Sequence, residues 1–386
     1  MEGPSTRRGA CARVATLAVA LVLAWSAARV HFVNGGNWTA LFCVGAIVPM
    51  PPELDPGIYR VEDGGYDGQF YRLLAHDPFL TKDFARYADA PRFRFRRGLV
   101  PLAAWLLAFG QQSWIDGAYI AVEMIFLALG TYWCARLFVR HGCAALWGLL
   151  FLAMPATLAS FDRMLLDGPL TALFAGFLLY SEEERWNRVW LLAMLAGLTR
   201  ETGLLLPAAL VADRVLRRDW RAAAGFAACA APALAWFAYV AARLPAGGPV
   251  DELGTPVWSL LRQLLVFRPY PDPIGQAVLR VTDFLAVAGL AASVILAALW
   301  LRKCRLGPVP ICVGLYVCLA LVLGPKVMVE AFSFGRVVSP LLLWIAMEAV
   351  MRRKWAALAP PLLVSLSVSL VFAKPLVAIG QALLGR

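Results

Sequence analysis

The stretch GGYDGQFYRLLAHDPF, residues 64–79, places one carboxylate beside a glycine and several aromatic side chains. Asp67 can accept the proton of an attacking hydroxyl, because a positioned carboxylate is a common general base. Asp63, which follows Glu62 in the same loop, can fill the same role and is the second candidate. The Asp67-Gly68 pair favours a turn, and Gly68 would let another group approach the backbone closely. Asp67 could equally be a solvated acid, since loops carry both kinds.

Aromatic and amide side chains continue this stretch. Tyr66, Phe70 and Tyr71 could stack against a sugar ring, or could anchor the loop at the membrane interface, where aromatic residues are enriched. Gln69 lies among them and adds a hydrogen-bonding amide. Gln69 and Tyr71 are therefore candidate substrate-binding residues.

An arginine-rich segment follows at residues 91–101, PRFRFRRGLVP. In an extended chain, Arg92, Arg94 and Arg96 would point to one side and the intervening phenylalanines to the other. With Arg97 beside them, they would form a cationic face at the level of the lipid head groups. The planar guanidinium suits phosphate oxygens, so a lipid-linked phosphate is the favoured ligand. General attraction to anionic lipid is the alternative.

Charged residues also interrupt later apolar segments. Asp162 ranks above Asp167 as a functional acid, because Asp167 precedes Gly-Pro and could simply cap the next helix. Arg200 and Glu201 break the apolar run LTRETGLLLP, and such charges are costly in a membrane unless they are paired or functional. Arg336 lies in another outward segment and can meet an anion. These residues extend the candidate site beyond the first loop.

The composition is typical of a polytopic membrane protein. Of 386 residues, 61% are hydrophobic and 16% are charged, and the mean hydropathy is +0.68. The net charge of +11 reflects the cytoplasmic excess of Lys and Arg in membrane proteins, so we exclude nucleic acid as a partner. The three histidines are scattered and the eight cysteines form no CxxC pattern, so neither a zinc site nor a disulfide framework is expected. Outer carboxylates could hold a divalent cation, although no spacing requires one.

Clusters of Arg and Lys in the short connections set the expected topology, because such clusters stay on the cytoplasmic side. We predict an all-α polytopic membrane protein with about eleven transmembrane helices, roughly ten to twelve, of about 20 residues each. The N-terminus would be cytoplasmic and the C-terminus outside. The first apolar run is longer than a signal-peptide core, which favours an uncleaved span. The predicted spans cover residues 13–33, 117–139, 143–161, 165–181, 189–200, 202–216, 221–243, 276–300, 308–324, 335–350 and 355–373.

The predicted organisation is one integral membrane domain. Residues 98–110 form a juxtamembrane helix, since the segment is too short to cross the bilayer and counting it as a span would reverse everything after it. The candidate site residues then face outward, and Glu123, inside the second span, is a conceivable partner for Arg200. The parts of residues 1–386 are the first span (13–33), the first outer loop (34–116), a central catalytic-type helix bundle (117–243), a second outer loop (244–275) and the C-terminal helices (276–386).

The order of these features resembles that of the C-type (GT-C) polytopic membrane glycosyltransferases. The features are a first span, a long outer loop with an early acid, a juxtamembrane helix, a proline-ended span followed by Ser-Phe-Asp, and an outer LTRET turn. YDGQFYRL and RFRFRRGLVPLAAWLL are similar to a pattern of bacterial members. Over about residues 10–215 the chain resembles the bacterial branch related to protein mannosyltransferases and lipid A aminoarabinose transferases. The resemblance implies a bacterial inner-membrane enzyme that transfers a sugar from a polyprenyl-phosphate donor to an acceptor at the outer face.

The resemblance also implies roles for the candidate residues. Asp67, or else Asp63, would be the general base, and Asp162 would orient donor or acceptor hydroxyls. In-line displacement would invert the anomeric carbon. The expected partners are the donor lipid, an unidentified acceptor and membrane lipid, and no cofactor is required. The arginines that would stabilise the departing polyprenyl phosphate are Arg94, Arg96, Arg200 and Arg336.

Two other classes of function fit parts of the pattern. A lipid or sugar-lipid transporter (a flippase) would bind the same phosphate without breaking a bond, and a membrane scaffold would need no ligand. A transporter is expected to line a path through the membrane with charged residues. Here the acids gather in outer segments and only Glu123 lies clearly within a predicted span, which favours the enzyme.

Overall fold

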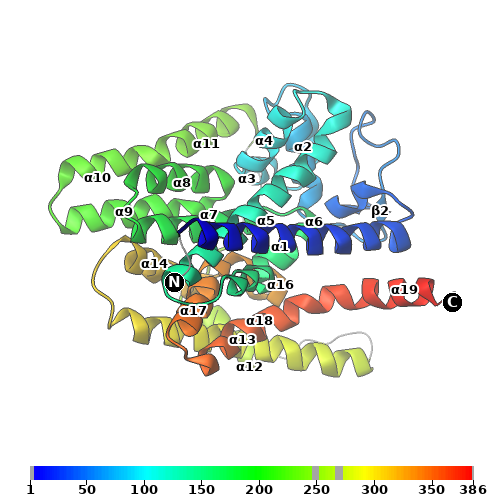
Figure 1. Cartoon of the computed structure of the whole chain (residues 1–386). Helices are drawn as coiled ribbons and strands as arrows, with labels where there is room; N and C mark the ends of the chain where they lie inside the picture. The colour runs from blue at the N-terminus through cyan, green and yellow to red at the C-terminus, as the bar shows by residue number, and fades with distance from the viewer. Residues whose placement is uncertain (1–3, 246–251, 266–272, 385–386) are drawn as a thin grey trace.

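Helices make up nearly all the regular structure of the chain, as the apolar composition predicts (Figure 1). The computed structural model describes residues 4–245, 252–265 and 273–384. Its elements are α1 (Pro4–Val33), β1 (Val44–Gly45), β2 (Arg60–Val61), α2 (Gly68–His76), α3 (Pro91–Arg94), α4 (Leu99–Leu107), α5 (Ile115–Arg140), η4 (Ala145–Ala153), α6 (Pro155–Arg163), α7 (Asp167–Glu182), α8 (Trp186–Thr199), α9 (Leu205–Leu216), α10 (Trp220–Ala227), α11 (Ala231–Arg243), α12 (Trp258–Leu265), α13 (Pro273–Leu301), α14 (Pro308–Val322), α15 (Pro325–Met328), α16 (Ala331–Val337), α17 (Ser339–Met351), α18 (Ala359–Ser369) and α19 (Ala373–Leu383).

Five helical stretches of the described chain are long and apolar enough to cross a membrane, which supports a multi-pass membrane protein. The number rises to seven if each of two bent pairs is one span: η4 with α6, bent by 64°, and α16 with α17, bent by 70°. The predicted eleven spans are not confirmed, because α7, α8, α9 and α14 occupy predicted positions but have only 16, 14, 12 and 15 residues. The five long stretches are Arg7–Val33, Gln112–Arg140, Trp220–Arg243, Val278–Leu301 and Trp355–Leu383.

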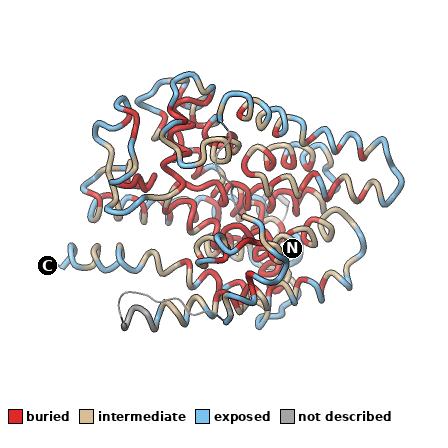
Figure 2. The backbone as a smooth tube through the Cα atoms, turned by 180° about the vertical axis from the view of Figure 1, so that it is seen from behind, coloured by how far each residue is buried: buried red, intermediate tan, exposed pale blue. Residues whose placement is uncertain are grey.

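Helix α7 runs through the interior of the bundle. Its residues from Asp167 to Tyr180 are all buried, and it packs against α5, α8 and α17. A helix that is apolar on every side belongs in such an interior position. In Figure 2 the buried backbone gathers inside the molecule, while the outer helices show mainly intermediate and exposed turns. The burial of α7 fixes its first residue, Asp167, at one end of the bundle.

Residues 34–114, which we call the cap, hold the short helices α2, α3 and α4 and a two-stranded parallel pair, β1 with β2. The cap has a hydrophobic core of its own, in which Phe42, Leu73 and Phe95 pack with Ile115 of α5 and Leu165. In Figure 1 the cap helices lie together above α5, and the strands lie beside them toward the end where the C-terminus emerges. The first predicted outer loop is therefore an ordered unit whose hydrophobic core is completed by residues of the adjoining bundle helices.

Gly68 joins the cap to the bundle. A Cβ at this position would lie 2.1 Å from the carbonyl oxygen of Arg163, at the end of α6, so only glycine lets α2 begin there. The close approach predicted for Gly68 is present, but the approaching group is this backbone carbonyl and not a ligand. The contact holds Asp67, the residue before α2, against the end of the bundle.

The predicted extended arrangement of the arginine segment is wrong. Pro91 begins the helical turn α3, because its fixed φ suits the first helical position. Helical spacing replaces the two-residue alternation, so Arg92, Arg94 and Arg96 do not share one side. Arg92 donates to the carbonyl of Ala241, and the guanidinium carbon of Arg96 lies 5.7 Å from the ring centre of Phe237.

The predicted juxtamembrane segment is a helix, α4. It packs against α2 and α5, and Val100 and Ala104 are fully buried there. Leu102, Leu106 and Leu107 remain exposed on the same helix. Such an apolar exposed face suits a helix that lies along a membrane surface. Of the second predicted outer loop, residues 246–251 and 266–272 lie outside the described part of the chain.

Candidate functional site

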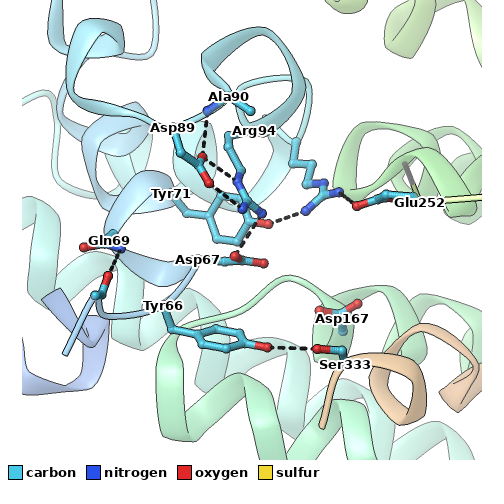
Figure 3. A network of polar contacts seen from close by, with 12 residues as sticks. Tyr66, Asp67, Gln69, Tyr71, Asp89, Ala90, Arg94, Asp167, Glu252 and Ser333 are labelled. Carbon is cyan, nitrogen blue, oxygen red and sulfur yellow. Dashed lines mark hydrogen bonds and ion pairs between the residues drawn. The ribbon is translucent and has the colours of Figure 1, made fainter. Parts of the chain in front are cut away.

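A pocket of about 500 Å³ lies between the cap and the segments α15 and α16. Acidic and basic side chains from distant parts of the sequence converge on it, and the close-up in Figure 3 shows Asp67, Tyr71 and Arg94 from the cap facing Glu252 and Ser333. Its lining side chains are Tyr66, Asp67, Asp89, Ala90, Phe93, Arg94, Arg97, Arg200, Glu252, Lys326, Val327, Glu330, Ser333, Arg336 and Val337.

Asp67 is bound by two arginines in this pocket. Its Oδ1 lies 2.9 Å from Nη1 of Arg94, and its Oδ2 lies 3.1 Å from Nη2 of Arg336. Asp67 precedes α2, yet its side chain accepts no hydrogen bond from the helix N-terminus. The carboxylate therefore turns into the pocket and joins α3 to α16.

The surroundings of Asp67 strongly favour its ionised form. Burial opposes ionisation, but attraction by Arg336 and Arg94, with a further contribution from Arg97 and Arg200, lowers the pKa of Asp67 from 3.8 to about 2. The carboxylate is thus charged at neutral pH. A carboxylate with both oxygens paired and so low a pKa is a poor proton acceptor, so the predicted base is not ready to act in this state.

Arg94 and Arg97 face the same pocket from one end of α3. Arg94 forms a two-pronged ion pair with Asp89, in which Nε and Nη2 each lie 3.0 Å from a carboxylate oxygen. Arg97 is 1% exposed; its Nε lies 3.1 Å from Glu201 Oε2, and its Nη1 donates to the hydroxyl of Tyr71 at 2.5 Å. Glu201 and Tyr71, both predicted to bind substrate, are hydrogen-bonded to Arg97 and do not line the pocket.

Arg200 and Arg336 meet at Asp167. Arg200 is paired with one oxygen of this carboxylate, and Nη1 of Arg336 lies 3.6 Å from the other. Arg336 therefore connects Asp167 to Asp67 through its two terminal nitrogens. The predicted pairing of Arg200 with Glu123 is wrong, because a nearer acid at the start of α7 takes that place.

Asp162 lies outside this cluster. Its carboxylate is bound by Arg29 of α1 and lies 3.3 Å from Nε of the adjacent Arg163. Asp162 does not line the pocket, whereas Asp167 belongs to the network that surrounds it. The structure thus places Asp167, which the sequence ranked second, in the network around the pocket, and pairs Asp162 with Arg29 of α1 because α6 ends at Arg163.

Several buried guanidinium nitrogens of the pocket have no hydrogen-bond partner among the described residues. They are Nη2 of Arg97, Nε of Arg200, and Nε and Nη1 of Arg336. Arg97 Nη2 lies 3.9 Å from Glu252 and Arg336 Nη1 lies 3.6 Å from Asp167, which is attraction without a hydrogen bond. Buried donors are normally paired, so these nitrogens leave hydrogen-bonding capacity unmet in residues that line the pocket.

Other predicted residues serve the local structure. Asp63 is exposed and accepts a hydrogen bond from the backbone N–H of Gly65 at 2.8 Å. Gln69 is buried, where it accepts from the N–H of Gly45 at 3.1 Å and donates to the carbonyl of Gly64 at 3.1 Å. Neither lines the pocket. Asp63 caps a turn, and Gln69 holds the start of α2 against β1.

The three aromatic side chains near Asp67 occupy two different environments. Tyr66 lines the pocket, and the guanidinium carbons of Arg336 and Arg163 lie 5.0 and 4.6 Å from its ring centre. Phe70 and Tyr71 are buried in the hydrophobic core of the cap. Their burial is at odds with anchoring in the membrane interface, and Tyr66 alone of the three can contact a ligand in this pocket.

Sequence reasoning missed three polar residues of the lining: Asp89, Glu252 and Ser333. Ser333 donates to Glu330 at 3.1 Å, and its oxygen lies 3.5 Å from the hydroxyl of Tyr66. Single acids in loops and a serine within an apolar helix carry no local signal of such a role. Only the arginine spacing could have pointed to Asp89, which lies five residues before Arg94.

The described residues include no group of three or more His, Cys, Asp or Glu side chains placed to hold a metal ion. Comparison of the chain with known protein families, characterised proteins and solved structures gave no match. The site is therefore characterised by its own geometry: arginines around the carboxylates of Asp67 and Asp167 that pair with these acids and still have buried nitrogens without a hydrogen-bond partner among the described residues.

Proposed function

We propose that this protein is a GT-C-type membrane glycosyltransferase that transfers a sugar from a polyprenyl-phosphate donor to an acceptor hydroxyl, with the phosphate bound in the pocket around Asp67. The observation that carries the proposal is the set of buried arginine nitrogens without hydrogen-bond partners. A phosphate has several acceptor oxygens, and arginine binds them through planar, charge-assisted hydrogen bonds. The sequence resemblance supplies the sugar and the carrier lipid.

The size of the pocket is compatible with this ligand. Its volume of about 500 Å³ falls within the range of about 300 to 1,000 Å³ common for small-molecule sites. Tyr66 and Phe93 provide flat apolar walls beside the arginines, and aromatic faces can stack on a sugar ring. A lipid tail would leave the pocket toward the apolar helices.

In the proposed reaction, Asp67 acts on the acceptor hydroxyl and the arginines act on the leaving phosphate. The acceptor oxygen attacks the anomeric carbon and forms the new glycosidic bond, while Asp67 takes the hydroxyl proton. The bond between the anomeric carbon and the phosphate oxygen breaks, and its electron pair leaves with the phosphate. Arg94, Arg97, Arg200 and Arg336 offset the charge that develops there. In-line attack inverts the anomeric configuration.

The location follows from charge distribution along the sequence. With the basic connections on the cytoplasmic side of the inner membrane, the N-terminus is cytoplasmic and the cap and pocket lie outside. A polyprenyl-phosphate sugar presented at that face would enter between the cap and the bundle. The acceptor, whether protein, lipid or polysaccharide, would approach from the same side.

The test is release of free polyprenyl phosphate from a panel of polyprenyl-phosphate sugars, with purified protein and acceptor membranes. Wild type should release it, and Asp67→Asn should slow release by about 100-fold or more, since general bases contribute roughly that factor. Asp63→Asn is the matched control and should stay within about twofold, because Asp63 only caps an exposed turn. Undiminished release by Asp67→Asn would contradict the assigned base. Binding without any release would favour a transporter.

A further inference from the structure

Asp67 already occupies donors that a phosphate would need. Its two oxygens are bound separately by Arg94 of α3 and Arg336 of α16. Arg94 gives its remaining nitrogens to Asp89, so its Nη1 is the only one directed at Asp67. Arg336 uses Nη2 for Asp67, while its Nε and Nη1 are without hydrogen bonds. The carboxylate and an incoming anion would therefore share Arg336.

Two anions in one pocket also repel each other. Arg97 and Arg200 line the same pocket as Asp67, and each has a buried nitrogen without a hydrogen-bond partner among the described residues. A phosphate bound to these nitrogens and to Arg336 would lie close to Asp67, and like charges at short range in a buried site interact strongly. We therefore expect the arginines of the pocket to bind either the Asp67 carboxylate or the phosphate, but not both at once.

We propose that Asp67 is a resident counter-ion that holds Arg94 and Arg336 until a phosphate displaces it, and that this displacement frees the carboxylate to act as the base. The inference rests on the proposed function and adds a new property to it: the base becomes active only when the donor phosphate is bound. Before binding, the carboxylate keeps the arginines in place. After binding, the same carboxylate has lost its cationic partners and attracts a proton more strongly.

The proton and electron changes are those of the transferase reaction. The proton of the acceptor hydroxyl moves to the freed oxygen of Asp67, the acceptor oxygen bonds to the anomeric carbon, and the carbon–oxygen bond to phosphate breaks with its electrons on the phosphate. When the phosphate departs, Asp67 releases its proton to solvent and pairs with Arg94 and Arg336 again. No oxidant, reductant or further reactant is needed.

Binding of farnesyl phosphate to the full chain in detergent, measured by calorimetry, tests the competition without any turnover. Asp67→Asn removes the competing charge and should bind farnesyl phosphate more tightly, by about 5- to 150-fold, the range of typical coupling between two ligands. Farnesol measures binding of the tail alone, and inorganic phosphate measures binding of the anion alone. Both anions should gain affinity in the variant, and farnesol should not.

Asp213→Asn is the matched control. Asp213 is also buried and paired with two arginines, with Arg217 Nε at 3.0 Å and Arg214 Nε at 3.6 Å, but it does not line the pocket around Asp67. Its substitution should leave the affinity for farnesyl phosphate within about twofold. A similar gain in this variant would mean that net charge, and not competition at Arg94 and Arg336, explains the result, and would overturn the inference.

The remaining outcomes separate the inference from the proposed function. If wild type binds farnesyl phosphate and Asp67→Asn binds it equally or more weakly, the inference fails and the phosphate site stands. If wild type and variants all fail to bind farnesyl phosphate, the inference and the proposed phosphate site both fail. If Asp67→Asn does not fold alone, the phosphate should replace the missing counter-ion and allow folded protein to be purified. Rescue by farnesyl phosphate but not farnesol would support the inference, and absence of rescue would overturn it.

Discussion

Two charge clusters of the cap region use the same residue types in opposite ways. In the first, which we call the clamp, Arg72, His76, Gln112 and Asp116 join α2 to the start of α5. Arg72 Nε and Nη2 each lie 2.8 Å from an oxygen of Asp116, and the two ring nitrogens of His76 lie 2.8 Å from Gln112 and 3.0 Å from Asp116. The second cluster surrounds the pocket and leaves several arginine nitrogens unpaired.

The contrast shows what separates a structural cluster from a candidate site. No side-chain nitrogen or oxygen of the clamp is buried without a hydrogen-bond partner in the described chain, and no clamp residue lines the pocket. The pocket cluster has arginines that line a hollow and keep buried nitrogens without a hydrogen-bond partner in the described residues. Both places pair buried arginine with aspartate, so unmet hydrogen-bonding capacity is the informative quantity.

The largest expected effect is on stability, at the clamp. Asp116→Asn leaves Arg72 buried without its ionic partner and should lower the free energy of unfolding by about 3 to 5 kcal/mol, the usual cost of breaking such a pair. Thermal unfolding in detergent measures it. Binding of farnesyl phosphate by the folded fraction should stay unchanged. A loss of binding with unchanged stability would reverse the roles assigned to the two clusters.

The next effect is on function, at the pocket. Arg336→Gln removes the arginine that contacts both carboxylates, and release of polyprenyl phosphate should fall about 100- to 1,000-fold, as when one stabilising donor of a transition state is lost. Arg72→Gln, the same substitution in the clamp, is the matched control. It should reduce stability while the release rate per folded molecule stays within about twofold. Equal losses of release in both variants would remove the distinction.

The smallest effect is the pH dependence of the pocket pairing. Because the pKa of Asp67 is lowered from 3.8 to about 2, its ionisation stabilises the folded state above about pH 4. This contribution, about 2 kcal/mol, is lost as the pH falls through about 2. The stability difference between wild type and Asp67→Asn should narrow over that interval, as seen in thermal unfolding. A difference that is independent of pH would show that Asp67 is not paired in solution.

The sequence predicted a helical, multi-pass protein because apolar runs bounded by basic residues are a strong local signal, whereas the predicted number of spans is not confirmed. It also identified Asp67, Arg94, Arg97, Arg200 and Arg336, which come together at the pocket. Their individual partners could not be predicted, since each comes from a distant segment. Asp167 resembled a helix cap in sequence, and its role in the network depends on how α7 is buried between other helices.

The arginine segment shows a second limit. One proline converts an expected extended run into a helical turn, and this change alone decides which arginines face the pocket. Arg94, the last residue of α3, and Arg97, three residues later, both line the pocket, whereas Arg92 and Arg96 contact α11. A two-residue periodicity would place Arg92, Arg94 and Arg96 together, which is the wrong set of arginines. Recognition of Pro91 as a first helical residue would have predicted the right one.

The contact between Gly68 and the Arg163 carbonyl connects the residue next to Asp67 to one of the bent apolar helix pairs. Arg163 is the last residue of α6, which forms one of the bent apolar pairs with η4. Because Gly68 has no side chain, the Arg163 carbonyl packs directly against the backbone at the start of α2. A change in that bend would push directly on the residue next to Asp67. Membrane thickness and lateral pressure, which act on the tilt of such helices, would thus be transmitted to the spacing of charges in the pocket.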